Sequence, residues 1–271
     1  MSQVFLDYDQ DELDRAYDQQ IWAPNRDAVI TRNALASEAV RARIGSPLTF
    51  AYGPTAVETL DVYRTECLNA PVMILLHGGA WRSGSARDYA FAAETFVKAG
   101  AHHVVPDFAT AMDVGLDGMV AQVRRAVAWV RMHAADFGAD PERLYLAGHS
   151  SGAHLAACAL TRLEFPKSAL LVSGVYDLLP VRLSARNEYL RIDEQLEHEY
   201  SPIRHVERIK SPVTVAWGEN EGAEFFRQSK EFAQKLGAPT VVGGGLNHFE
   251  MIETLADPRS PLARAALTML R

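Results

Sequence analysis

LYLAGHSSGAHLAACAL, residues 144–160, decides the fold of this chain. Its first four residues form a short apolar run typical of a buried strand, and its Ala-rich second half is typical of a helix. Between them lies a G-x-S-x-G sequence, Gly148-His149-Ser150-Ser151-Gly152. A sharp strand-to-helix turn needs small residues on either side of its apex, and it lifts the apex side chain above the sheet. The stretch therefore predicts a nucleophile elbow with Ser150 at its tip.

Apolar segments alternate with amphipathic ones along most of the remaining chain. The expected strands are 48–52, 58–63, 72–76, 104–105, 144–147, 169–172, 213–217 and 240–242. The expected helices are 87–99, 116–134, 151–161, 224–236 and 260–270. This alternation predicts an α/β-hydrolase fold, a mostly parallel sheet with helices on both faces, in a single domain over 1–271. The spacing of apolar residues in 1–45 favours helices and predicts an arm or cap. The segment 178–205 is charged and irregular, which predicts an insertion near the site.

Composition excludes several classes of protein. The net charge is −7 and no basic stripe occurs, so we expect a small-molecule substrate and no nucleic acid partner. No run of 18 apolar residues or secretory leader is present, so we expect no membrane partner. Cys67 and Cys158 lie outside any metal-binding spacing, which favours reduced thiols and a cytoplasmic location. The sequence predicts neither a metal nor a cofactor, and it leaves a homodimer open.

Strand 72–76 leads into His77-Gly78-Gly79-Ala80-Trp81. Paired glycines after an early strand let the backbone approach a carbonyl oxygen that a Cβ atom would exclude. We therefore expect an oxyanion hole built from the amide of Gly78 or Gly79, or of the adjacent Ala80, together with that of Ser151. His77 stands at the strand end, where a structural hydrogen bond is the favoured role.

The general base and its acid partner should follow later strands, in the chain order Ser, acid, His. His248, after strand 240–242, is the histidine that fits this order. After strand 213–217, Gly218-Glu219-Asn220-Glu221 offers two glutamates, and the third position after the glycine selects Glu221. Glu219 and Asp177 remain alternatives for the acid.

Several stretches together resemble one family, the serine-dependent arylformamidases, also called kynurenine formamidases. They are HGGAWRSGS at 77–85, GHSSGAHLA at 148–156, LLVSGVYDL at 170–178, SPIRH at 201–205, GENEGAEFFRQS at 218–229 and NHFEMIE at 247–253. The resemblance implies Ser150 as nucleophile, His248 as base and the HGGAW segment as oxyanion loop. The family has an aspartate where this chain has Glu221, and its elbow more often reads Ser-Ala than Ser-Ser.

By this resemblance, the expected reaction is hydrolysis of a small acyl amide, such as the formyl amide of an aryl amine like N-formylkynurenine, by Ser-His-Glu acyl transfer. A carboxylesterase for short-chain or aryl esters is the alternative, and a catalytically silent hydrolase fold used for binding is a remote one. A small acyl group needs little room, so specificity should lie in an aromatic pocket for the leaving group, with Trp81, Tyr176 and Phe249 as candidates.

Overall fold

The sheet at the centre of the molecule has eight strands in the order β1-β2-β4-β3-β5-β6-β7-β8, in a computed structural model that describes residues 3–271. The strands are β1 (Leu48–Ala51), β2 (Thr59–Tyr63), β3 (Ala70–Leu76), β4 (His102–Pro106), β5 (Ala139–His149), β6 (Ser168–Val172), β7 (Val213–Gly218) and β8 (Thr240–Gly243). The β1–β2 and β2–β4 pairs are antiparallel, and all later pairs are parallel. The predicted α/β-hydrolase sheet is confirmed.

The chain changes direction across the sheet at its centre. It passes from β3 outward to β4 and then returns to the other side of β3 to form β5. In open α/β sheets, ligands bind beyond the carboxyl ends of the strands at such a switch point. All seven residues of β3 are buried, and β3 ends directly before His77, while β5 ends directly before Ser150. The topology thus brings the two glycine motifs together at one edge.

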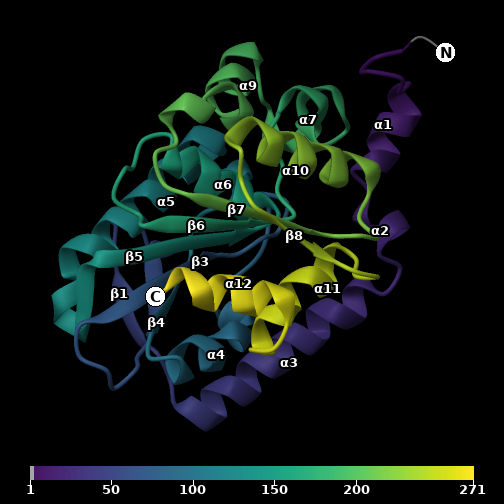
Figure 1. Ribbon diagram of the computed structural model, residues 1–271. Helices are drawn as coiled ribbons and strands as arrows, with labels where there is room; N and C mark the ends of the chain where they lie inside the picture. The colour runs from purple at the N-terminus through teal and green to yellow at the C-terminus, as the bar shows by residue number, and fades with distance from the viewer. Residues whose placement is uncertain (1–2) are drawn as a thin grey trace.

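Helices cover both faces of this sheet (Figure 1). On one face lie α5 (Ala111–His133), α6 (Ser151–Leu160) and α10 (Ala223–Leu236), and on the other α4 (Ala93–Lys98), α11 (His248–Glu253) and α12 (Pro261–Met269). The expected helix 87–99 is wrong in its first half, because residues 86–92 form a 3₁₀ helix and only α4 is α-helical. Helix α11 was not expected. None of the helices described here is long and apolar enough to cross a membrane.

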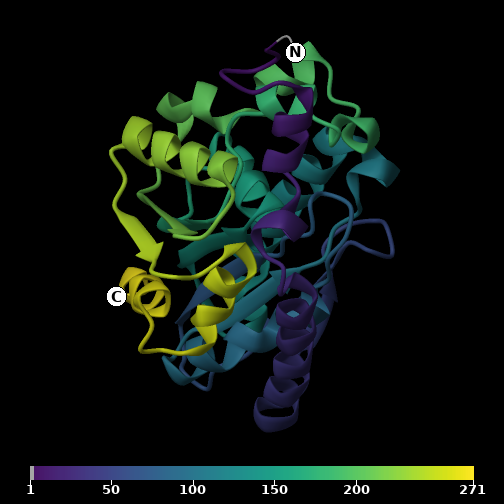
Figure 2. The same ribbon diagram turned by 90° about the vertical axis from the view of Figure 1, so that its right-hand side faces the viewer.

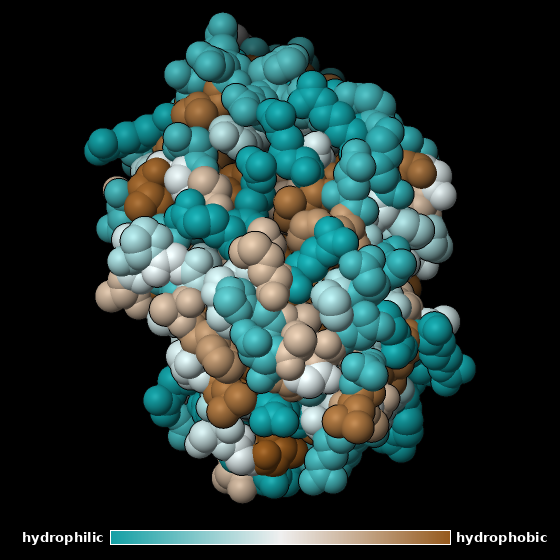
Figure 3. Space-filling view, turned by 90° about the vertical axis from the view of Figure 1, so that its left-hand side faces the viewer, coloured by the Kyte–Doolittle hydropathy of each residue, from teal (hydrophilic) through white to brown (hydrophobic). Residues whose placement is uncertain are grey.

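The segment before the sheet is helical, as expected, with α1 (Gln10–Ala16), α2 (Gln19–Trp22) and α3 (Arg26–Ile44). Figure 2 shows this arm in purple, running from top to bottom across the face of the molecule that is turned toward the viewer. Two of its contacts come from the far end of the chain: Asn25 donates to Glu250, and Arg32 forms a bidentate ion pair with Glu253. The opposite side, in Figure 3, is mainly hydrophilic, with hydrophobic residues in separate small groups.

The charged segment 178–205 folds as short helices, α7 (Leu179–Leu183), α8 (Asn187–Leu190) and α9 (Glu194–Glu199), followed by a 3₁₀ turn at 202–204. It is fixed to the arm, because the backbone amide of Ala185 donates to Asp14 and Gln10 donates to the carbonyl of Leu183. The arm and this segment therefore meet beside the carboxyl edge of the sheet.

Candidate active site

Ser150 stands at a strained turn between β5 and α6. Its backbone has φ 55° and ψ −123°, a conformation that residues other than glycine rarely adopt. Its own amide donates to the carbonyl of Val172 at 2.8 Å, which fixes the turn to the neighbouring strand β6. A Cβ atom on Gly152 would collide with the carbonyl oxygens of Leu76 and His77. The glycine of the motif is therefore needed so that α6 can approach β3, which holds the serine at the switch point.

Glu221 and His248 form a buried pair at the same edge. Nδ1 of His248 lies 2.9 Å from Oε2 of Glu221, and their side chains are 2% and 0% exposed. The other carboxylate oxygen accepts hydrogen bonds from the Ser173 hydroxyl at 2.5 Å and from the Gly218 amide at 2.6 Å. A buried carboxylate with both oxygens partnered is held in one orientation, so the pair is rigid.

The two alternative acids lie elsewhere. Glu219 is exposed and accepts from the amide of Gly245 at 2.8 Å. Asp177 accepts from the amide of Leu179 and lies 3.5 Å from Arg204. Neither carboxylate is hydrogen-bonded to His248, whereas Glu221 is.

His248 is the first residue of helix α11, a helix that was not among those expected from the sequence. Asn247 caps this helix: its side chain accepts from the amides of Phe249 and Glu250, and the Glu250 carboxylate in turn accepts from the amide of Asn247. The Asn-x-x-Glu spacing is a capping-box signal present in the sequence. The cap fixes the backbone beside His248 and so helps to aim its ring.

The loop after β3 presents free amides beside the elbow. Gly79, Ala80 and Trp81 all have positive φ, at 133°, 52° and 60°. The carbonyl of Gly79 accepts from the amides of Arg82 and Ser83, which closes the loop on itself. Among residues 3–271, no backbone hydrogen bond uses the amide of Gly79, Ala80 or Ser151. These three donors are available to an oxyanion.

His77 supports this loop and does not line the cavity, whereas Gly78 does. His77 is buried, its Nδ1 lies 2.9 Å from the carbonyl of Gly78, and its ring stacks on Phe108 at 4.2 Å. Burial lowers the pKa of His77, which favours the neutral ring. A Cβ atom on Gly78 would lie 3.0 Å from the hydroxyl of Tyr89. His77 thus has the structural position that its place at a strand end predicts.

His149 lies between Tyr89 and the backbone of the base, His248, and hydrogen-bonds to both. Its Nε2 donates to the carbonyl of His248 at 3.0 Å, and its Nδ1 accepts from the hydroxyl of Tyr89 at 2.8 Å. Burial holds the pKa of His149 well below its usual range, and the nearby His248 adds to this. His149 is therefore a neutral ring with a fixed tautomer, and Tyr89 is a site residue that sequence reasoning missed.

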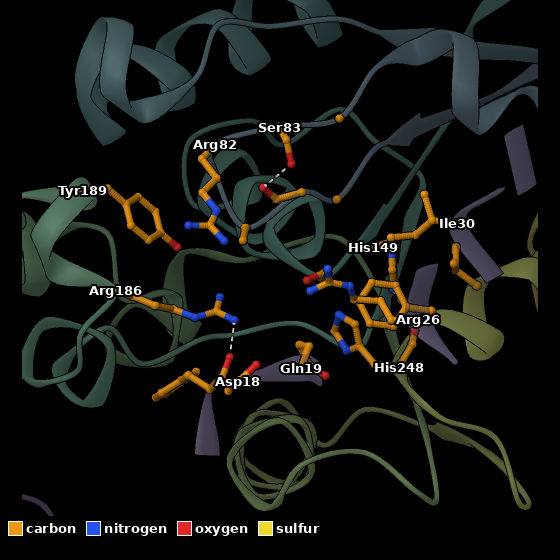
Figure 4. A pocket seen from close by; sticks show the side chains of 18 of the residues that line it. Asp18, Gln19, Arg26, Ile30, Arg82, Ser83, His149, Arg186, Tyr189 and His248 are labelled. Carbon is orange, nitrogen blue, oxygen red and sulfur yellow. Dashed lines mark hydrogen bonds between the residues drawn. The ribbon is translucent and has the colours of Figure 1, made fainter. Parts of the chain in front are cut away.

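These groups surround a cavity of about 720 Å³ that is shown in Figure 4. Ser150, His248, Gly78 and Gly79 line it, and so does Phe249, as expected for a pocket residue. Its other aromatic walls are Tyr17 from the arm, Tyr89, and Tyr189 from the 178–205 segment. The segment therefore does lie at the site, and the arm covers it.

Trp81 and Tyr176, expected in the pocket, do not line it. Trp81 is 1% exposed and donates from its indole nitrogen to Nδ1 of His154 at 3.1 Å. Tyr176 is fully buried and stacks on Phe232 with the ring centroids 4.1 Å apart. Both large rings pack into the core beneath the site, so this expectation is wrong for them.

Comparison with known proteins agrees with the geometry. Family models described as BD-FAE and as the prolyl oligopeptidase family match residues 60–166 and 119–251. A kynurenine formamidase of Danio rerio is 34% identical over 96% of this chain and 96% of its own length, and that of Salmo salar is 33% identical over 97% of each. Esterase LipQ of Mycobacterium tuberculosis is 30% identical over 80% of this chain and 60% of its own.

Solved structures show the same architecture. A Silicibacter protein described as a candidate thioesterase superposes with a TM-score of 0.86 at 26% identity, over 95% of this chain and 99% of its own. Carboxyl esterase 2 of the fungus Tuber melanosporum has a TM-score of 0.67 at 21% identity over 83% of each chain, a likeness in fold.

Fold and comparisons together define a serine hydrolase of the α/β-hydrolase class. Within that class, the chain belongs to the kynurenine formamidase family, which its match to the fish enzymes over nearly the whole of both chains shows.

Proposed function

We propose that this protein hydrolyses formyl-type amides of aryl amines by acyl transfer through Ser150, His248 and Glu221. The observation that carries the proposal is that His248, paired with the buried Glu221, lines one cavity together with a serine held at a strained elbow. Family membership supports the formamide, because the relatives that cover nearly the whole chain are named kynurenine formamidases.

In the first step, Nε2 of His248 removes the proton of the Ser150 hydroxyl as its oxygen attacks the carbonyl carbon. Glu221 holds the proton on Nδ1 and stabilises the imidazolium that forms. The amides of Gly79, Ala80 and Ser151 are the proposed donors to the oxyanion, and Gly78 is the remaining candidate of the loop. His248 then protonates the leaving amine, and water activated by the same ring releases the acyl group from Ser150.

Ser150→Ala tests the nucleophile. We expect kcat to fall by about 10⁶-fold, as when the serine of a triad is removed, while the circular dichroism spectrum stays that of the parent. A fluorophosphonate probe should label the parent protein and not the variant. Ser151→Ala is the matched control, because it removes the neighbouring hydroxyl and keeps the amide. Full turnover in Ser150→Ala would overturn the mechanism, and an unlabelled parent would favour a catalytically silent fold.

A carboxylesterase is the second candidate, and the relatives named esterases favour it. The same triad serves both reactions, so a comparison of substrates decides between them. We expect kcat/KM for an aryl formamide to exceed that for p-nitrophenyl acetate once corrected for the uncatalysed rates. The reverse order would make the esterase the better description.

We also propose that the protein works in the cytoplasm, because Cys67 and Cys158 are both free thiols. The single domain over residues 1–271 and the homodimer stay predictions. A single cooperative unfolding transition and light scattering would test them.

A further inference from the structure

Arg186 places a guanidinium group in the wall of the cavity, and this group has no carboxylate partner within residues 3–271. Arg186, directly before α8, is only partly exposed and lines the cavity together with Ser150. Its Nη2 donates to the backbone carbonyl of Tyr17 at 2.7 Å. Its neighbours in the same segment are paired, since Arg182 and Arg204 both bind the buried carboxylate of Glu197. Arg186 therefore differs from these two arginines of its own segment.

The surroundings of Arg186 are aromatic. Its Cζ lies 5.3 Å from the ring centroid of Tyr17, 5.8 Å from that of Phe225 and 6.0 Å from that of Trp81. The Phe225 ring also contacts the His248 ring at 4.7 Å, so one ring separates the guanidinium from the base. Aromatic faces stabilise a cation without neutralising its charge.

A second cation faces the same space. Figure 4 shows the guanidinium groups of Arg82 and Arg186 both turned into the cavity, with His248 across from them. Arg82 lies over the Tyr189 ring at 5.0 Å. Burial, and more weakly the charge of Arg82, lower the pKa of Arg186, although an arginine keeps its proton throughout the physiological range.

The acidic residues that line the cavity do not neutralise this pair of cations by direct contact. They are Asp14, Asp18, Asp88 and Glu188. Asp14 accepts from the amide of Ala185 and from Gln10, and Asp18 caps α2 at the amide of Gln20. Within the described residues, none of the four forms an ion pair with Arg82 or Arg186. Asp18 acts on Arg186 only as the weakest of the neighbouring charges.

Removing a guanidinium group partly from water without a counter-ion costs free energy. The group has five N–H donors in a planar fork, a geometry that matches a carboxylate. The protein keeps such a group facing the cavity, with one donor engaged by a backbone carbonyl. We propose that Arg186 is a specificity-determining residue that binds a carboxylate on the leaving group of the substrate. The inference rests on the proposed acyl transfer at Ser150, and it places the charge on the leaving group because a formyl group has none.

Matched pairs of substrates test this inference. The charged members are para-formylamino derivatives of benzoate, phenylacetate and phenylpropionate, and the neutral members are the corresponding primary amides. For at least one chain length, we expect the parent protein to prefer the charged member by about ten-fold or more in kcat/KM, the effect of a charge-assisted hydrogen bond. In Arg186→Met, that preference should fall to about one, mainly through KM.

Two further variants keep the test decisive. Arg264→Met removes an exposed arginine of α12 and should leave the preference at its parental value. Arg186→Lys keeps the charge and loses the fork, so it should lower the preference by about three-fold or more, and it carries the test if Arg186→Met does not fold. A parental preference of one at every chain length, or an unchanged preference in both Arg186 variants, would overturn the inference.

A binding measurement separates this inference from the proposed function. In the Ser150→Ala background, calorimetry with the same pairs measures Kd without turnover. Tighter binding of a charged member that disappears with Arg186→Met supports the role of Arg186 even if the parent protein cleaves no formamide. Conversely, rapid cleavage of formamides with equal Kd for both members would uphold the proposed function and reject the role of Arg186.

Discussion

The two sides of the cavity are built in different ways. The reaction centre, Ser150, Ser173, Glu221 and His248, sits on the ends of strands and at the start of one helix, and all four residues are nearly buried. The recognition wall, Tyr17, Arg186 and Tyr189, comes from the arm and the 178–205 segment and includes an unpaired charge. The parallel sheet fixes the positions of the residues in the reaction centre, whereas segments outside the sheet fix those of the recognition wall. Chemistry and specificity can therefore change separately in this fold.

After the loss of Ser150 itself, the largest effect should come from breaking the rigid pair of Glu221 and His248 in the reaction centre. Glu221→Gln keeps the shape but allows the wrong tautomer of His248, so we expect kcat to fall by about 10⁴-fold. Glu221→Asp shortens the side chain by one methylene and should cost up to about 10²-fold, the effect of a displacement near 1 Å. Glu219→Gln is the control with parental kcat. Steady-state kinetics on one formamide measures all three, and an inactive Glu219→Gln with an active Glu221→Gln would assign the acid to Glu219.

A smaller effect should follow from the serine that supports Glu221. Ser173→Ala removes the 2.5 Å hydrogen bond to the carboxylate and leaves that of the Gly218 amide, so we expect kcat to fall by about ten-fold. Ser229→Ala is a matched control, since Ser229 is also fully buried and its hydroxyl has no partner. Equal kcat values for the two variants would show that Ser173 does not position Glu221.

On the recognition wall, the effect should fall on binding. The Tyr17 hydroxyl accepts from Gln228 at 2.8 Å, which anchors the arm to α10. Tyr17→Phe keeps the ring beside Arg186 and loses the anchor, so KM for a carboxylated substrate should rise by about two- to ten-fold, with a smaller change in kcat. Tyr145→Phe, a nearly buried tyrosine in β5, is the control. A loss confined to kcat would place Tyr17 with the reaction centre instead.

The smallest effect on catalysis should come from a histidine outside both regions. His103 is fully buried, and its ring stacks on that of Phe96 with the ring centroids 5.0 Å apart. Burial lowers the pKa of His103 to about 3, from a usual value of 6.5. As pH falls below 6.5, His103 binds a proton in the unfolded chain but stays neutral in the folded protein. The folded protein therefore loses stability until the pH reaches about 3.

His103→Phe should therefore reduce the slope of unfolding free energy against pH by about 1.4 kcal/mol per unit between pH 6 and 4, as measured by urea titrations. His133, whose side chain is 41% exposed and lies beside Asp136, offers the control variant His133→Phe. An identical slope in His103→Phe and the parent would mean that His103 is not kept neutral in the folded protein. Activity at pH 7 should be close to parental, because His103 does not line the cavity.

The difference between the reaction centre and the recognition wall also explains which site residues could be predicted from the sequence. Strand periodicity and the glycine motifs place Ser150, Glu221 and His248 after the ends of predicted strands. Because parallel strands end at the same edge of a sheet, this pattern alone predicts that the three residues lie close together. Arg186 escapes such reasoning because its position depends on the Tyr17 carbonyl, 169 residues earlier in the chain. Trp81 and Tyr176 were expected in the pocket because they adjoin site motifs, but the direction of their rings is decided by core packing. Helix α11 was missed although its capping residues, Asn247 and Glu250, are readable in the sequence.

The docking of the arm has a consequence for the order in which the molecule assembles. Asn25, Arg32 and Tyr17 bind residues that lie 225, 221 and 211 positions later in the chain. Contacts this distant in sequence close late, because the chain between them must first be ordered. During synthesis on the ribosome, these three contacts must wait until the residues between 228 and 253 have emerged. Until then the carboxyl edge of the sheet stays exposed to solvent and to chaperones. The cavity that the arm covers is therefore the last part of the protein to be completed.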